Sequence, residues 1–175
     1  ERMKGSIEAE SKEDSGIVVK FCLPFEKQVE KEEVPIFKLK NLADKHVMAV
    51  SDDLDIIRSL KELLTSWHCR FDDASDKQSA LEKLEIALDE DAPVDLIIID
   101  MQMTQTAPEE FAVEIKENPD LFNTQIIMLS DFGRRGDAQR LKSIGVVGYL
   151  PKPVVPEQLY DCIATVLASA FPSRR

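Results

Sequence analysis

From residue 45 onward, short apolar runs alternate with segments in which apolar residues recur every three or four positions. The short runs contain many β-branched residues, and a run of that length without polar alternation is typical of a strand buried on both faces. The recurring pattern is typical of a helix with one buried face. The predicted strands span residues 46–51, 69–74, 94–99, 125–130 and 146–150, and the predicted helices span residues 53–67, 76–88, 108–116, 134–143 and 156–168.

Five strand–helix units in succession, joined by short connections, predict an α/β fold with one parallel sheet and helices on both faces. We expect a doubly wound, five-stranded, flavodoxin-like sheet in which the strands, numbered along the chain, take the order 2-1-3-4-5. Ser75 or Asp76 is expected to cap the second helix, and Gly145 to end the fourth. This fold class matters for function because its ligands bind beyond the carboxyl ends of the strands.

The first 28 residues follow a different pattern. Gly5–Ser11 alternates in the manner of a strand, and Ile17–Pro24 forms a second strand candidate after a polar turn, which together predict a hairpin. An isolated two-stranded hairpin is marginally stable in water. The next segment is charged, contains Pro35 and predicts a linker with at most one short strand, near Ile36 and Phe37. The expected organisation is a hairpin segment over residues 1–28, a linker over 29–44 and a globular domain over 45–171.

Composition restricts the classes of partner. The 175 residues include 22 Lys and Arg against 33 Asp and Glu, a net charge of −11, which argues against nucleic acid or an anionic membrane surface as the main partner. No apolar run approaches the roughly 20 residues of a membrane span, and no secretory signal opens the sequence. The three cysteines lack metal-ligand spacing, so we expect reduced thiols, a cytoplasmic location and no membrane contact by this segment. His46 and His68 have no partner motif and are expected to be structural or solvent-facing.

Polar residues lie at the ends of four of the five predicted strands: Ser51, Asp52 and Asp53 at the end of the first, Asp100 after the third, Ser130 at the end of the fourth and Lys152 after the fifth. Parallel strands bring these ends to one edge of the sheet, so the side chains are expected to converge. Crowded carboxylates repel one another unless a cation joins them, and oxygen ligands of this kind suit Mg²⁺. Lysine would supply a positive charge for a phosphoryl group. Taken singly, each aspartate could instead cap a helix or a loop, and the lysine could be a solvated surface residue. The combination favours a site.

This constellation resembles the receiver domain of two-component signalling proteins over roughly residues 45–170. The resemblance implies that Asp100 is the phosphate-accepting aspartate and that the Asp52–Asp53 pair holds Mg²⁺. It implies that Lys152, within Leu-Pro-Lys-Pro, pairs with the phosphoryl group. The remaining matches are the metal-binding backbone carbonyl of Gln102, the switch hydroxyl of Ser130 and the aromatic switch residue Tyr149.

Other stretches resemble one subclass of receivers, those carried on hybrid sensor histidine kinases. Gly133–Ala138 and Gln158–Asp161 look like that subclass. The N-terminal segment is similar to the closing part of the ATP-binding domain of sensor histidine kinases, at Met3, Gly5, Ile7, Glu10, Ser11, Gly16, Phe21, Leu23 and Pro24. The nucleotide-binding boxes of that family are absent from this sequence, so no ATP binding is expected of it. The resemblance implies a hybrid kinase as the parent protein, which could be membrane-anchored.

The sequence departs from the usual receiver pattern at two places. After Met103 most receivers have proline and then Asp-Gly, whereas this chain continues as Thr104–Glu110, two residues longer and without the proline or glycine at those places. Asp131 follows the switch serine at a position where small residues are usual, and its charge would repel a phosphoryl group or reshape the pocket. Phe132, together with Gln102, could shield a phosphorylated carboxylate from water.

The resemblance implies Mg²⁺-dependent transfer of a phosphoryl group from a phosphohistidine to Asp100, followed by a conformational signal through Ser130 and Tyr149. The expected partner is the phosphohistidine domain of a histidine kinase or a histidine phosphotransfer protein, and homodimerisation is left open. One alternative is a pseudo-receiver that binds partners without phosphorylation, which the long loop and Asp131 motivate. Another is a flavodoxin-like nucleotide or flavin binder. The acidic pair and the lack of a glycine-rich loop after the first strand disfavour it.

Overall fold

The computed structural model describes residues 5–12, 16–22, 24, 42–104, 107–131 and 137–170. Contacts divide the chain into two compact units, Glu1–Val34 and Pro35–Arg175, and each is described by itself. Most of the predicted linker, including Ile36 and Phe37, lies outside the described residues. Its last residues, 42–44, form a turn, and Leu42 is fully buried in the core of the second unit. The fold therefore includes residues ahead of the expected boundary at residue 45.

The first unit contains the predicted hairpin. Strands β1 (Ser6–Lys12) and β2 (Gly16–Cys22) pair antiparallel, with Ile7 opposite Phe21 and Ala9 opposite Val19. Directly opposed residues share a face of the ribbon, so these apolar side chains form one apolar face. Ile7 is 75% and Phe21 71% exposed. The hairpin prediction is confirmed, and its apolar face is uncovered by the described residues of this unit.

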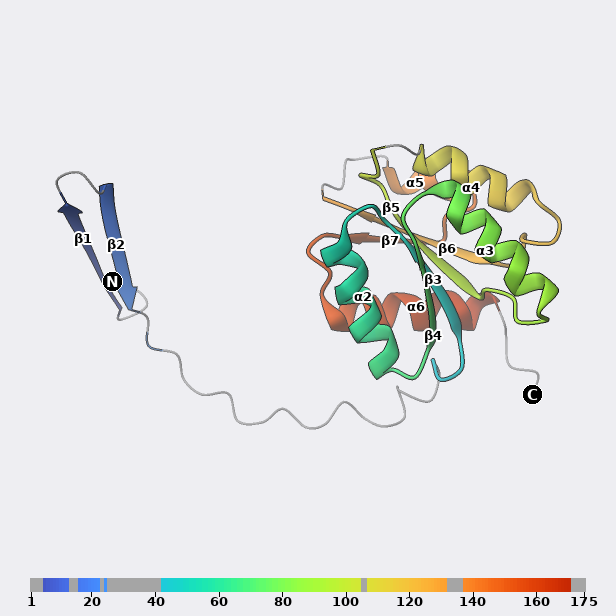
Figure 1. The fold of residues 1–175 in the computed structure, drawn as a ribbon, viewed down its shortest axis with the longest axis horizontal. Helices are drawn as coiled ribbons and strands as arrows, with labels where there is room; N and C mark the ends of the chain where they lie inside the picture. Colours follow the sequence, from blue (N-terminus) through green and yellow to red (C-terminus); the bar gives the residue numbers. More distant parts are fainter. Residues whose placement is uncertain are drawn as a thin grey trace. The chain divides into compact units, whose positions relative to one another are not determined.

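The second unit is built on one parallel sheet, which Figure 1 shows at the centre of the fold. Its strands have the spatial order β4-β3-β5-β6-β7, which is 2-1-3-4-5 when they are counted along this unit, so the predicted fold class and strand order are confirmed. The strands are β3 (His46–Val50), β4 (Arg70–Ala74), β5 (Leu96–Asp100), β6 (Gln125–Ser130) and β7 (Gly148–Pro151). The central strand β5 ends on Asp100 itself.

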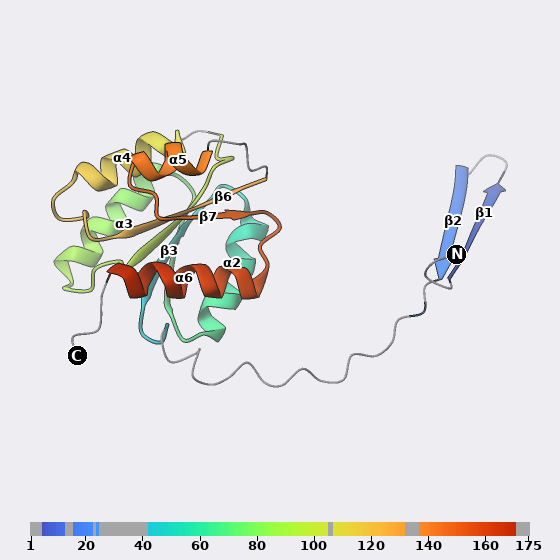
Figure 2. The same ribbon diagram turned by 180° about the vertical axis from the view of Figure 1, so that it is seen from behind.

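Helices cover both faces of the sheet, as Figures 1 and 2 show from opposite sides. On one face, α2 (Leu54–Ser66) and α6 (Pro156–Ala170) bury leucines and isoleucines against one side of the strands. On the other, α3 (Lys77–Asp89), α4 (Pro108–Glu117) and α5 (Asp137–Ser143) pack on a second cluster that includes Phe111 and Leu141. All five residues of β3 and of β5 are buried, as expected for strands covered on both faces.

Local sequence signals account for several element ends. Asp76 caps α3 by accepting a hydrogen bond from the Ser79 backbone N–H at 2.9 Å, and hydrogen bonds from Ser79 and Ser75 hold the pKa of this carboxyl below its ordinary value. The φ of Gly145 is +86°, which lets the chain leave α5, and β7 begins at Gly148, two residues later than predicted. A Cβ at Gly148 would lie 2.7 Å from Cγ1 of Ile127, so glycine permits this close approach of β7 to β6.

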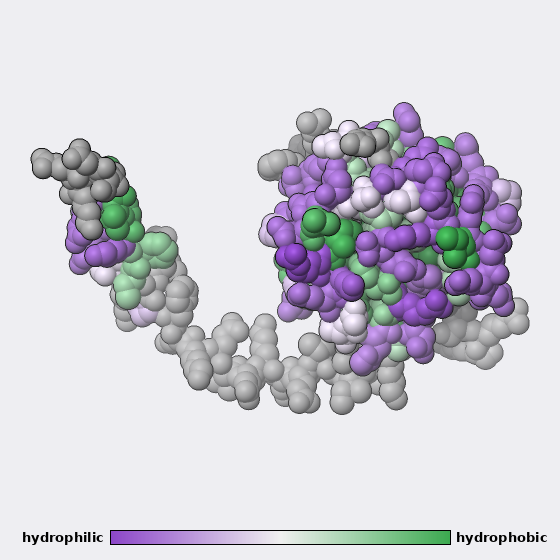
Figure 3. Space-filling model, viewed as in Figure 1, coloured by the Kyte–Doolittle hydropathy of each residue, from purple (hydrophilic) through white to green (hydrophobic). Residues whose placement is uncertain are grey.

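The face of the second unit that Figure 3 shows is largely hydrophilic, with small apolar patches over α2 and α3. Exposed apolar side chains on these helices are Leu54 and Ile86. Among the helices of the described residues, none is long and apolar enough to cross a membrane.

Candidate functional site

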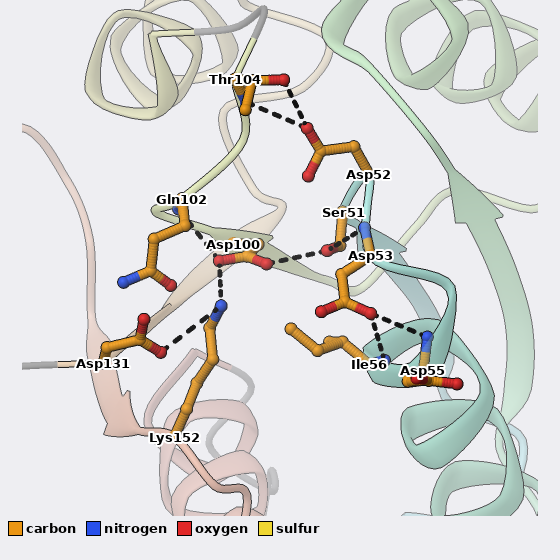
Figure 4. A network of polar contacts seen from close by, with 10 residues as sticks. All are labelled: Ser51, Asp52, Asp53, Asp55, Ile56, Asp100, Gln102, Thr104, Asp131 and Lys152. Carbon is orange, nitrogen blue, oxygen red and sulfur yellow. Dashed lines mark hydrogen bonds and ion pairs between the residues drawn. The ribbon is translucent and has the colours of Figure 1, made fainter.

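Asp100 is the buried centre of a polar cluster at the carboxyl ends of the strands (Figure 4). It is only 2% exposed. The hydroxyl of Ser51 donates to its Oδ2 at 2.8 Å, and the backbone N–H of Gln102 donates to its Oδ1 at 3.0 Å. The ammonium of Lys152 lies 2.7 Å from the same Oδ1. A buried carboxylate is costly unless it is hydrogen-bonded and paired, and these three groups meet that requirement.

Lys152 is shared between two carboxylates. Its backbone N–H donates to the carbonyl of Ser130 at 2.9 Å, which fixes the start of the connection after β7 beside the end of β6. From there its side chain, 15% exposed, reaches Asp100 and also lies 3.8 Å from Oδ1 of Asp131. Asp131 is half exposed, so its interaction with the ammonium is the weaker one.

The acidic pair after β3 has two separate sets of hydrogen bonds. Asp53 caps α2, because its Oδ1 accepts from the backbone N–H groups of Asp55 at 2.8 Å and Ile56 at 3.4 Å. Asp52 is exposed, and its Oδ2 accepts from both the backbone N–H and the hydroxyl of Thr104, at 3.0 and 2.8 Å. These two bonds are the main cause that lowers the pKa of Asp52 below its ordinary value. The capping alternative therefore describes Asp53 but not Asp52.

The expected switch residues lie on the two strands beyond Asp100. Ser130 ends β6 and is buried. Tyr149 lies on β7 and packs against the cluster beneath α3, α4 and α5. Its hydroxyl is buried and makes no hydrogen bond to any of the described residues. Phe132, the proposed shield, lies outside the described residues.

The carboxylate oxygen atoms of Asp52, Asp53 and Asp100 are the type of ligand that Mg²⁺ prefers. The described residues nevertheless include no group of three or more His, Cys, Asp or Glu side chains arranged to hold a metal ion. Mg²⁺ is usually bound by one or two carboxylates and several waters rather than by a complete protein cage. Asp52 and Asp53 each have one carboxylate oxygen that accepts no hydrogen bond described above, and Asp100 and Gln102 lie at the same edge (Figure 4). A partly hydrated divalent cation is therefore compatible with this edge.

Two residues of the cluster had no role in the sequence-based expectation. Ser51 directly precedes the acidic pair at the end of the first strand, and this position was the available signal for its contact with Asp100. Thr104 gave no such signal. Its partner Asp52 lies 52 positions earlier, and the contact depends on the path of the loop after β5. The sequence therefore predicted that these polar residues converge, but it did not predict the hydrogen bonds of Ser51 and Thr104.

Comparison with known proteins identifies relatives of the second unit. A family model described as the response regulator receiver domain matches residues 47–164, more than half of the chain. The polar-differentiation response regulator DivK of Brucella ovis is 27% identical over 93 residues, which cover 53% of this chain and 74% of the relative. The structure of the chemotaxis protein CheY4 of Vibrio cholerae is 29% identical, with a TM-score of 0.63, and covers 71% of this chain and 99% of the other.

A further solved structure supports the fold alone. It is the CheX–CheY complex of Borrelia burgdorferi with BeF3 and Mg, at 19% identity and a TM-score of 0.66. The match covers 74% of this chain and 97% of the other.

Proposed function

Because the chain belongs to the response regulator receiver domain family, we propose that Asp100 is the carboxylate that accepts a phosphoryl group in two-component signalling. The observation that carries the proposal is the environment of Asp100. It ends the central strand, is almost fully buried, and still keeps a lysine ammonium at 2.7 Å. A purely structural role would not explain why this aspartate lies at the edge of the sheet where α/β folds bind their ligands.

The transfer forms a bond between a carboxylate oxygen of Asp100 and phosphorus while the phosphorus–nitrogen bond of a phosphohistidine breaks. The imidazole leaves with the electron pair of that bond. The Ser51 hydroxyl and the Gln102 N–H orient the carboxylate, and Lys152 pairs with an oxygen of the phosphoryl group. Catalysis of this kind consists of positioning and charge stabilisation.

Mg²⁺ is the cofactor that we propose for this step. Asp52, Asp53, Asp100 and the backbone carbonyl of Gln102 are the groups that would hold it. When bound, the ion neutralises charge on the transferring phosphoryl group. The chain's own contribution is to keep these acids at one edge, with Asp53 fixed by its cap and Asp52 by Thr104.

Ser130 and Tyr149 are the proposed switch. After phosphorylation Ser130 donates to a phosphoryl oxygen, and Tyr149 changes its packing against the α5 side of the sheet. The buried Tyr149 hydroxyl supports this role. It makes no hydrogen bond to the described residues, so no hydrogen bond has to break when the ring moves.

The hairpin supports a wider context. Its sequence resembles the end of a kinase ATP-binding domain, and its exposed apolar face suits packing against a larger domain. We therefore propose a hybrid sensor histidine kinase in the cytoplasm, with or without a membrane anchor, as the parent protein. The partner of Asp100 is then that kinase's phosphohistidine domain or a histidine phosphotransfer protein.

The test is phosphorylation by a small phosphodonor, acetyl phosphate, in the presence of Mg²⁺, followed by intact-protein mass spectrometry. The wild type should gain one phosphoryl group, and Asp100→Asn should gain none. Asp89→Asn, which alters an exposed aspartate in α3, is the matched control and should be labelled like the wild type. Equal labelling of Asp100→Asn would exclude Asp100 as the acceptor.

The second candidate is a pseudo-receiver that binds partners without being phosphorylated. It is favoured by the contact of Asp131 with Lys152, which places an extra negative charge beside the acceptor. The same labelling experiment separates the two functions, because a pseudo-receiver would leave the wild type unlabelled by both acetyl phosphate and a phosphorylated histidine partner.

A further inference from the structure

We propose that Thr104 is a positioning residue that holds Asp52 ready for a divalent cation and thereby sets the Mg²⁺ affinity of the site. This inference rests on the proposed function. Thr104 lies in the loop after β5, at the point where the sequence departs from the usual receiver pattern, and it reaches Asp52, which follows β3 (Figure 4). Its backbone N–H and its hydroxyl both donate to the same carboxylate oxygen, Oδ2 of Asp52.

The arrangement leaves half of the carboxylate available. An ionised carboxylate has about four lone-pair positions, two on each oxygen. The two bonds from Thr104 occupy Oδ2, and Figure 4 shows the other oxygen of Asp52 turned toward the side of the site where Asp100 lies. Thr104 therefore fixes the side chain without covering the oxygen that a cation or its bound water would use.

The two hydrogen bonds from Thr104 matter because the Asp52 side chain is exposed. An exposed side chain without partners samples several rotamers, and ordering it on metal binding costs free energy. Partners that orient a metal ligand from behind typically contribute tenfold to a hundredfold in metal affinity. Thr104 has this relation to Asp52, and its two bonds remove that cost before the ion arrives.

The departure from the receiver pattern makes this contact possible. The resemblance places Thr104 where most receivers have proline, and proline has neither a backbone N–H nor a hydroxyl to donate. Neither of the two bonds to Asp52 could form with proline at this position. The departure from the usual pattern therefore adds a donor pair to the acidic site.

The experiment measures Mg²⁺ binding by isothermal titration calorimetry for the wild type, Thr104→Val and Thr104→Ser. Valine keeps the shape and the N–H but loses the hydroxyl, and we expect about tenfold weaker binding, the low end of the usual range because the contact is exposed. Serine keeps the hydroxyl and should bind like the wild type. Thr65→Val on the exposed face of α2 is the matched control and should leave binding unchanged.

Each outcome separates this inference from the proposed function. Unchanged affinity in Thr104→Val would overturn the role of Thr104, and tighter binding would show instead that Thr104 competes with the ion for Asp52. Both results leave the proposed function intact if the wild type binds Mg²⁺ and is labelled by acetyl phosphate. A wild type that binds no Mg²⁺ would overturn both. Thermal unfolding of every variant checks that a loss of binding is not a loss of fold.

Discussion

The two ends of the parallel sheet use the same kinds of side chain for different purposes. At the amino ends, Asp95 accepts from the Lys45 ammonium at 3.0 Å and from the backbone N–H of His46 at 2.9 Å. The His46 ring lies 2.9 Å from the Ala92 carbonyl and 2.7 Å from the Asp72 carboxylate. Each ring nitrogen of His46 therefore has an acceptor within hydrogen-bonding distance. Asp95 and Asp72 each have a nitrogen partner, so the polar groups of this network satisfy one another.

At the carboxyl ends the acids outnumber their cationic partners. Among the described residues, the Lys152 ammonium is the one positive group that pairs with any of Asp52, Asp53, Asp100 and Asp131. Hydrogen bonds from Ser51, Thr104 and backbone N–H groups support three of these acids without adding a positive charge. The satisfied network at the amino ends fits a structural role, and the acidic excess at the carboxyl ends supports the proposed cation site.

The largest expected effect comes from removing the Lys152 ammonium at the carboxyl ends of the strands. Lys152→Met would leave the buried Asp100 carboxylate without its partner, which should destabilise the protein by about 3 kcal/mol in denaturant unfolding without Mg²⁺. Added Mg²⁺ should narrow the difference. Lys61→Met on the exposed surface of α2 should have no comparable effect, and equal stability of the two variants would show that Asp100 does not depend on Lys152.

Matched Asp→Asn substitutions should separate the two ends by about 2 kcal/mol. Asp95→Asn removes the anion that accepts from Lys45, and it should destabilise the protein by about this amount. Asp53→Asn keeps a good capping residue for α2 and relieves the acidic excess, so without metal its stability should stay within about 0.5 kcal/mol of the wild type. Urea unfolding of both variants measures this, and equal losses would contradict the proposed difference between the ends.

Substitutions of two threonines, one at each end of the sheet, should differ in how their effect on stability depends on pH. Thr124 at the amino end donates to the Val94 carbonyl at 3.0 Å, so Thr124→Val should cost about 1 kcal/mol at every pH. Thr104 donates to a carboxylate and lowers the pKa of Asp52. A pKa that is lower in the folded state contributes stability above the unfolded value, and this contribution is lost as the pH falls through the folded value. Thr104→Val should therefore lower Tm at neutral pH and leave Tm unchanged at a pH low enough to protonate Asp52 in the folded protein. The same loss at both pH values would contradict this role of the carboxylate.

The smallest expected effect concerns Asp131. Asp131→Asn removes one negative charge near the position of an incoming phosphoryl group, and at roughly 6 Å in water this repulsion is worth about 0.7 kcal/mol. Labelling by acetyl phosphate should become about threefold faster, as measured by the initial rate. The expected increase should shrink at high salt. Slower labelling of Asp131→Asn would contradict this prediction. It would indicate that Asp131 helps to position the Lys152 ammonium for the transfer.

Apolar patterning predicted the sheet, because strands buried on both faces leave continuous runs such as residues 96–99. It also predicted the polar cluster around Asp100, because the polar residues at strand ends interrupt those runs. The donors that hold the acids were not predictable in the same way. The bond from Thr104 to Asp52 depends on a loop path that no periodicity encodes. The burial of Leu42 was missed because the segment before residue 45 is rich in charged residues and its few apolar residues follow no helix or strand period.

The acidic excess at the carboxyl ends is tested most directly by Mg²⁺ calorimetry on the wild type and on the double variant Asp52→Asn/Asp53→Asn. Both changes keep the shape of the side chains, and Asn at residue 53 preserves the cap of α2. We predict that the wild type binds a single Mg²⁺ ion per chain and that the double variant binds none. No Mg²⁺ binding by the wild type at millimolar concentration, or equal binding by the two proteins, would contradict the role proposed for these aspartates.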